Sequence, residues 1–203
     1  MHTVEKLIRD EKQHEAYVFS DGHRFRITLV DCDRLSLEEG ADLSESQFEQ
    51  LVSSEARLAC IQKAFVFLSY GDLSKKRLTE KLRRSFDREL CAETADLLEE
   101  RGYLNDLCLA ERYAENYYEL RSYGPMRIKQ ELFGKGFSAD VIEQAIEPYF
   151  SMDHREKLKK LFEKRFSKEN LVDAVAKRKA SVWLNRYGYS WSEISDVLNE
   201  FFE

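Results

Sequence analysis

The chain has 203 residues, of which 43% are hydrophobic and 34% charged, and only two are prolines. This composition is enough to bury a core and favours long solvated helices, which argues against a disordered chain and against a protein built mainly of sheet. The formal net charge of −6 argues against binding nucleic acid through bulk positive charge, so such contact would need local basic patches.

No segment has the pattern of a membrane span or a signal peptide. The longest apolar runs, such as residues 64–68, are far too short to cross a bilayer, and residues 1–10 carry charges where a signal peptide needs an apolar core. We therefore expect a soluble, cytoplasmic protein without membrane contact.

The N-terminal segment has the pattern of a small sheet. Polar and apolar residues alternate over residues 24–29, and Asp21-Gly22 just before them is a strong hairpin signal. Residues 3–8 can add a third strand. An acidic connector over residues 31–42 follows, and Ser44 then opens a capping-box pattern that predicts a short helix ending at Val52. The prediction for residues 1–54 is an appendage of β-strands plus one short helix.

A first unit of three helices is predicted over residues 55–104. Its first helix carries one apolar stripe, formed by Leu58, Ile61, Phe65 and Leu68. A basic helix over residues 75–84 follows the cap Ser74, and a third helix begins after Asp87 and ends at Gly102.

Residues 105–150 and 151–203 repeat this order. In the second unit the first helix carries an inward stripe of Leu109, Tyr113, Tyr117 and Leu120. Pro125 then stands at the favoured first position of the middle helix, and Ser138 caps the last helix. In the third unit a middle helix is predicted over about residues 171–187.

The motif Gly136-Phe137-Ser138 recurs as Gly188-Tyr189-Ser190 and sets the register of the repeat. The two serines lie 52 residues apart, and Asp87 precedes Ser138 by 51. The predicted fold is mainly α: three tandem three-helix repeats in an elongated, curved array behind the N-terminal β appendage.

Chemistry-bearing patterns are scarce. The four cysteines lie far apart without a Cys-x-x-Cys pair, and the four histidines are dispersed in polar contexts without metal-ligand spacing. No nucleophile elbow, phosphate loop or dinucleotide fingerprint occurs. We expect reduced, mostly packed thiols, no cofactor, no metal and no enzymatic activity.

Basic residues gather in the middle helix of each unit. Aligned on the inward leucine, the same repeat position holds Arg77, Arg127 and Lys179. The other basic residues of these helices that we assign to partner binding are Lys75, Lys76, Lys81, Arg84, Lys129, Lys135 and Arg178. A basic stripe of this kind suits phosphates or an acidic protein surface, and an ordinary solvated face is the alternative reading.

Two further features could contact a partner. Trp191 follows the Ser190 cap and is the better candidate among the many aromatics, since Tyr113 and Tyr117 lie on a predicted buried stripe. A second basic run over residues 155–168 alternates with apolar residues and is read as the solvated side of its helix.

Several segments together resemble one known family. They are Arg101-Gly102-Tyr103-Leu104-Asn105-Asp106, the Ala110-x-x-Tyr113 helix, Tyr123-Gly124-Pro125-x-Arg127-Ile128-x-x-Glu131-Leu132-x-x-Lys135-Gly136, and the Gly-aromatic-Ser starts. These motifs are similar to those of the RecX family of bacterial recombination regulators. The first unit departs from the family pattern, with Arg84-Ser85-Phe86 where Lys-Gly-Phe is common.

The resemblance implies a function without catalysis. Members of the family bind the RecA recombinase filament in its helical groove and restrain filament growth, ATP hydrolysis and strand exchange. By this resemblance we expect a monomer whose partner is the RecA filament, with possible weak contact to DNA. The alternative is a direct single-stranded DNA-binding module that affects recombination by competing for DNA.

Overall fold

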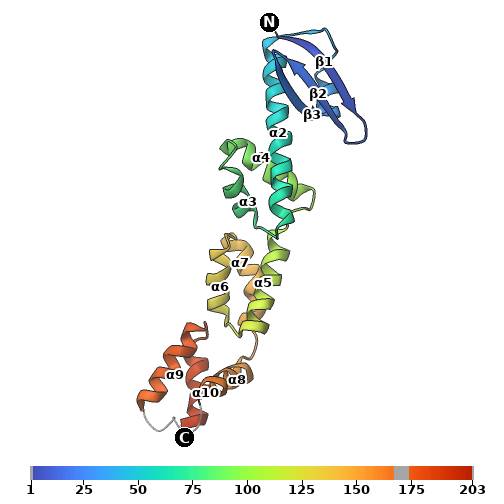
Figure 1. The fold of residues 1–203 in the computed structure, drawn as a ribbon. Helices are drawn as coiled ribbons and strands as arrows, with labels where there is room; N and C mark the ends of the chain where they lie inside the picture. Colours follow the sequence, from blue (N-terminus) through green and yellow to red (C-terminus); the bar gives the residue numbers. More distant parts are fainter. Residues whose placement is uncertain (1, 167–173, 203) are drawn as a thin grey trace. The chain divides into compact units, whose positions relative to one another are not determined.

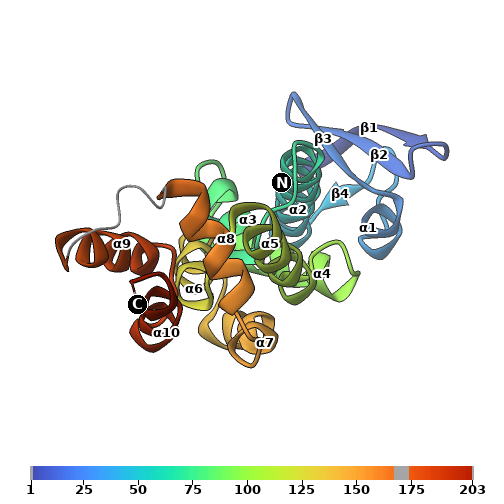
Figure 2. The same cartoon turned by 90° about the horizontal axis from the view of Figure 1, so that it is seen from below.

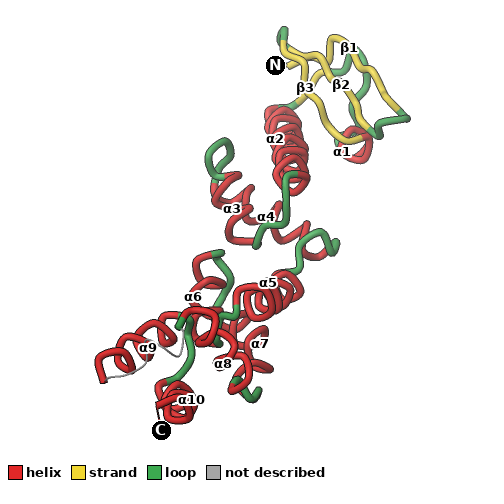
Figure 3. Tube along the Cα trace, turned by 60° about the horizontal axis from the view of Figure 1, so that its bottom comes forward, coloured by secondary structure: helices red, strands yellow, loops and turns green. Residues whose placement is uncertain are grey.

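The computed structural model describes residues 2–166 and 174–202, and these divide into two compact units. The first comprises Met1–Leu73 with Leu78–Tyr103, and the second comprises Ser74–Arg77 with Leu104–Glu203. The fold is mostly helical with strands confined to the N-terminal part, as predicted (Figures 1 and 3). Among the described residues, no helix is both long and apolar enough to cross a membrane.

The N-terminal strands form one antiparallel sheet in the order β3-β2-β1-β4. The strands are β1 (His2–Asp10), β2 (Glu15–Ser20), β3 (His23–Thr28) and β4 (Asp42–Leu43). Asp21 and Gly22 both have positive φ, 52° and 72°, as a tight two-residue hairpin between β2 and β3 requires. The hairpin and the third strand are thus confirmed, and β4 is an addition that the sequence did not reveal.

The predicted connector over residues 31–42 was wrong in its first part. Residues Leu29–Arg34 form helix α1, because the Thr28 hydroxyl accepts a hydrogen bond from the Asp31 amide at 3.0 Å and caps its start. Cys32 on this helix is fully buried in the core between sheet and helices.

The predicted short helix ending at Val52 was also wrong, because α2 runs without a break from Glu45 to Ser69. The Ser44–Gln47 capping box that starts it is confirmed. Glycine and proline are absent from this stretch, so nothing interrupts the backbone ladder at residue 54. The boundary proposed between residues 54 and 55 therefore falls inside a helix.

The buried face of α2 also differs from the predicted stripe. Its buried residues are Leu51, Ser54, Cys60 and Ala64. Leu58, Ile61 and Leu68 are only half-buried, and Phe65 is 38% exposed. Three of these four buried side chains are small, and a search for large apolar residues overlooks them.

The first unit also contains α3 (Lys75–Leu82), part of which belongs to the second unit, and α4 (Arg88–Glu100). α3 ends two residues before the predicted Arg84. The Asp87 carboxylate accepts hydrogen bonds from the amides of Glu89 and Leu90, both at 3.0 Å, and Gly102 follows α4 with φ +76°.

The second unit contains the remaining helices, and α5, α6 and α7 pack on one another, as do α8, α9 and α10 (Figures 1 and 2). Their bounds are α5 (Asp106–Arg121), α6 (Pro125–Gly134), α7 (Ala139–Phe150), α8 (Arg155–Arg165), α9 (Ala174–Arg186) and α10 (Trp191–Phe202). The start predicted for the middle helix of the third repeat, Leu171, lies outside the described residues.

The Ser138 cap of α7 and Pro125 as the first residue of α6 follow the sequence signals. The Asn105 side chain also accepts a hydrogen bond from a backbone amide at the start of α5. Ser190 and Glu193 bond reciprocally at the start of α10. One inward prediction was wrong: Leu120, in the last turn of α5, is 80% exposed, whereas Tyr117 and Tyr118 just before it are buried in the core of α5, α6 and α7.

Candidate partner-binding surface

Arg77 lies where α6 ends. Its guanidinium donates a hydrogen bond to the Gly134 carbonyl at 2.6 Å, and Ser74, itself buried, donates to the Lys135 carbonyl at 2.8 Å. Carbonyls at a helix C-terminus lack intrahelical donors, and a cation there also opposes the negative end of the helix dipole. Arg77 and Ser74 therefore cap α6.

The turn after α6 needs glycine at this contact. Gly136 has φ +88°, and a Cβ there would lie 3.3 Å from the Ser74 hydroxyl and 3.4 Å from Arg77 Cγ. The start of α3 and the turn between α6 and α7 are thus fitted to each other.

Arg127 occupies the corresponding place at the start of α6. The Gly124 amide donates to the Tyr187 carbonyl at 2.7 Å, and the Met126 amide donates to the Gly188 carbonyl at 3.2 Å. The Arg127 guanidinium itself pairs with Glu131 at 2.7 Å and lies 5.5 Å from the centre of the Tyr123 ring. Both Arg77 and Arg127 thus have structural contacts, so packing alone accounts for a cation recurring at these two positions.

Other predicted basic residues are also engaged. Lys129 lies 3.7 Å from Glu143, Lys135 Nζ lies 3.9 Å from the centre of the Tyr113 ring, and Lys81 Nζ lies 5.2 Å from that of Phe67. The Lys75 side chain is half-buried. A partner would have to displace or share these contacts, which lowers the gain from binding them.

The remaining predicted cations are exposed: Lys76, Arg84, Arg178 and Lys179. Within residues 2–166 and 174–202, none of these four takes part in an ion pair. Trp191, the first residue of α10, is 57% exposed. These five side chains are the members of the predicted set that the structure leaves available to a partner.

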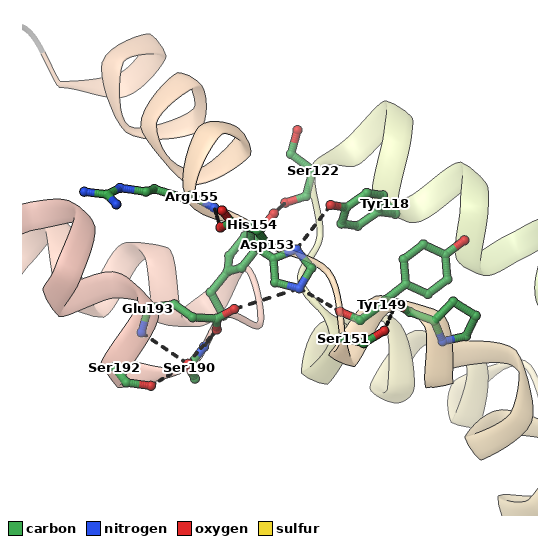
Figure 4. A network of polar contacts seen from close by, with 12 residues as sticks. Tyr118, Ser122, Tyr149, Ser151, Asp153, His154, Arg155, Ser190, Ser192 and Glu193 are labelled. Carbon is green, nitrogen blue, oxygen red and sulfur yellow. Dashed lines mark hydrogen bonds and ion pairs between the residues drawn. The ribbon is translucent and has the colours of Figure 1, made fainter.

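His154 has a role that its sequence context did not indicate. Its neighbours Asp153 and Arg155 are charged, yet the His154 side chain is only 3% exposed. Its Nε2 lies 2.7 Å from the Tyr149 carbonyl, which can only accept, so Nε2 carries the proton and donates. In the neutral ring Nδ1 then accepts from the Tyr118 hydroxyl at 3.2 Å (Figure 4). The imidazole thereby joins α5, the end of α7 and the start of α8.

The surroundings of His154 complete this junction. Glu193 of α10 lies 3.8 Å from Nε2 (Figure 4). The Tyr189 ring packs edge-on against the imidazole, and its hydroxyl donates to the Ser122 carbonyl at 3.0 Å. Burial raises the pKa of the Tyr189 and Tyr118 hydroxyls, so both remain protonated donors.

The cysteines are free thiols, with Cys32, Cys60 and Cys91 buried and Cys108 exposed. Among the described residues, no group of three or more His, Cys, Asp or Glu side chains could hold a metal ion.

A family model described as the second three-helix domain of RecX matches residues 105–146, which include α5, α6 and most of α7. A regulatory protein RecX from Bacillus pumilus is 30% identical over 194 residues, covering 93% of this chain and 70% of the relative. The chain belongs to the RecX family. A further RecX, from Caldanaerobacter subterraneus subsp. tengcongensis, is 27% identical over 202 residues, covering 97% of this chain and 98% of the relative.

Solved RecX structures have the same fold. A crystal structure of regulatory protein RecX matches with a TM-score of 0.82 at 20% identity, covering 98% of this chain and all of that one. RecX from Lactobacillus salivarius matches with a TM-score of 0.65 at 25% identity, covering 72% of this chain and 96% of that one. This RecX chain is accordingly a regulatory protein by its relatives, and its mostly helical fold with three-helix domains is that of the family.

Proposed function

We propose that this RecX protein is a cytoplasmic modulator of the RecA recombinase, acting without catalysis of its own. It binds the RecA–DNA filament and restrains filament extension, ATP hydrolysis and strand exchange. The observation that carries the proposal is membership of the RecX family over 93% of the chain, with relatives that are named regulatory proteins.

The exposed basic residues supply the means of contact. Lys76 and Arg84 come from the first predicted repeat and Arg178 and Lys179 from the third, and none of the four has an ion-pair partner among the described residues. Several weak contacts on one chain reinforce one another when the partner is a polymer that repeats the same surface. A filament would then be bound more tightly than a RecA monomer.

The test is the DNA-dependent ATPase of RecA, measured with single-stranded DNA in large excess. A filament binder continues to slow the ATPase at any excess of DNA, because its target is the filament. Under the alternative function, a DNA-binding module that competes for the strand, added DNA relieves the inhibition. Complete relief by DNA would therefore refute the proposal.

The basic surface is tested by charge reversal at the available positions. Lys76→Glu, Arg178→Glu and Lys179→Glu combined should abolish inhibition, because opposite charge replaces three contacts at once. The matched control reverses Lys6, Lys12 and Arg88, which are also exposed cations. Full inhibition by the folded triple variant would place the functional surface elsewhere. Arg77 and Arg127 are left unchanged, because their loss would weaken the fold as well.

A further inference from the structure

A cavity of about 530 Å³ lies in the second unit, among the end of α5, α8 and α9. Its volume is within the range of roughly 300–1,000 Å³ that small-ligand sites occupy. Its lining residues are Leu120, Arg121, Ser122, Lys160, Leu161, Lys164, Arg165, Trp183 and Tyr187. The lining shares no residue with the predicted partner set, and three of its cations belong to the basic run that was read as a solvated face.

The described lining of the cavity carries charges of one sign. Arg121, Lys160, Lys164 and Arg165 line it, and none of the described lining residues is acidic. In the described part of the chain, none of these four cations forms an ion pair. Cations gathered in a concavity with no acid among them concentrate the local field and attract anions.

Other cations of α8 behave differently. Lys157 lies 3.3 Å from a Glu119 oxygen, and Lys159 lies 2.6 Å from a Glu200 oxygen. The helix therefore pairs its cations with carboxylates everywhere except at the cavity. Lys160 and Lys164 are one turn apart, a spacing at which like charges repel by roughly 0.2–0.5 kcal/mol. A bound anion would relieve this repulsion.

Aromatic rings form the other part of the lining. Trp183 lies on α9 and Tyr187 directly follows that helix; their ring centres are 4.6 Å apart, and both side chains are half-buried. The edge-on ring of Phe166, 5.6 Å from Trp183, fixes the indole further. Aromatics beside cations hold single-stranded nucleic acid by stacking on the base while the cations bind phosphate. An acidic peptide would use the cations and leave the rings without a partner.

We propose that this cavity binds a nucleotide, with the base against Trp183 and the phosphate at Lys160, Lys164 and Arg165. The nucleotide is either free or one residue of a single strand, since both present a base next to phosphate. The inference goes beyond RecA modulation, because such binding needs no RecA and uses residues outside the basic surface described above. Its failure would leave the filament proposal untouched.

The first test follows the fluorescence of Trp183 in the full chain without RecA. Trp191→Phe leaves Trp183 as the remaining tryptophan of the two. An oligothymidylate, ATP and an oligoglutamate peptide are titrated separately at low salt. Saturable quenching by the oligothymidylate alone would identify the ligand as single-stranded nucleic acid. Quenching by both the oligothymidylate and ATP would identify the ligand as a nucleotide, whether free or in a strand. Quenching by neither, or equal affinity for the peptide, overturns the proposal.

The second test removes the cavity's charge. Lys160→Gln, Lys164→Gln and Arg165→Gln combined should weaken binding of the nucleotide probe that quenches Trp183 at least about 10-fold and flatten its salt dependence. The matched control, Lys76→Gln, Arg178→Gln and Lys179→Gln, removes the same charge elsewhere and should change affinity by less than about threefold.

All six positions are exposed, so folding is preserved and is verified by circular dichroism. Trp183→Leu, measured with a fluorescein-labelled form of the same probe, should weaken binding about 10-fold through lost stacking. Equal losses in the cavity and control variants, or unchanged affinity in Trp183→Leu, would overturn the assignment.

Discussion

Gly188 is the position at which the repeat architecture is most sensitive to one methyl group. It has φ +94°, and a Cβ there would lie 2.2 Å from the Arg127 amide nitrogen, 2.5 Å from Arg127 Cβ and 2.8 Å from its Cα. These atoms belong mostly to the backbone at the start of α6 and cannot turn aside as a flexible side chain could. Gly188→Ala must therefore push the turn before α10 away from α6.

The cost follows from two contributions. Holding a residue that has a Cβ at positive φ lowers the free energy of unfolding by about 1–2 kcal/mol. Separation of the two segments also breaks the hydrogen bonds from Gly124 to Tyr187 and from Met126 to Gly188, at about 1 kcal/mol each. The expected loss is about 3–4 kcal/mol, a large part of the 5–15 kcal/mol that typically stabilises a domain.

Gly102→Ala is the matched control, since Gly102 also has positive φ, +76°, but no atom lies within 4 Å of an added Cβ. The Gly102→Ala variant should lose only the free energy that positive φ costs a residue with a Cβ, about 1–2 kcal/mol. Urea denaturation followed by circular dichroism measures both free energies of unfolding, and hydrogen exchange should place the added opening in α8, α9 and α10. Equal losses in the two variants would refute the steric reasoning.

Three other side chains give sharp expectations. Arg77→Ala should lower the free energy of unfolding by about 1 kcal/mol because α6 loses its cap, whereas the neighbouring exposed Lys76→Ala should change it by less than about 0.5 kcal/mol in the same urea titration. His154→Phe should cost about 2–3 kcal/mol by leaving a buried hydroxyl and a carbonyl without partners, and a thermal or urea melt equal to that of the native protein would contradict this. Burial raises the pKa of Cys91 to about 11, so at pH 8 a thiol reagent should react rapidly with Cys108 alone and with all four cysteines after unfolding.

Local signals predicted the helix starts well, because a cap depends on residues adjacent in sequence. Ser44, Asp87 and Ser138 all accept from amides two or three residues ahead, as their sequence contexts indicated. Burial was harder to predict where it depends on neighbouring elements. Leu120 continues the apolar stripe of α5 and yet is exposed, while Tyr117 and Tyr118 beside it are buried in the core of α5, α6 and α7.

The candidate site shows a deeper limit of sequence reading. The repeat register correctly identified Arg77 and Arg127 as equivalent positions. A cation that caps or braces a neighbouring helix, however, recurs with the same period as a cation that binds a partner, so the period alone does not separate the two roles. The cavity was missed for the opposite reason. Lys160 and Trp183 lie on separate helices, and only the packing of α8 beside α9 brings them to one lining.

The Gly-aromatic-Ser motif joins consecutive three-helix groups, and each of its residues has a distinct task. Glycine, which has no Cβ, lets the start of the previous group's middle helix pack closely against the turn. The aromatic side chain is buried, with Phe137 4% and Tyr189 1% exposed. Serine caps the helix that follows. This division of tasks also explains why the first group has Ser85 where glycine is common. The described chain before α2 is sheet and α1, so no earlier middle helix lies against that turn, and Ser85 does not adopt positive φ. Glycine is thus required only where one group meets the group before it.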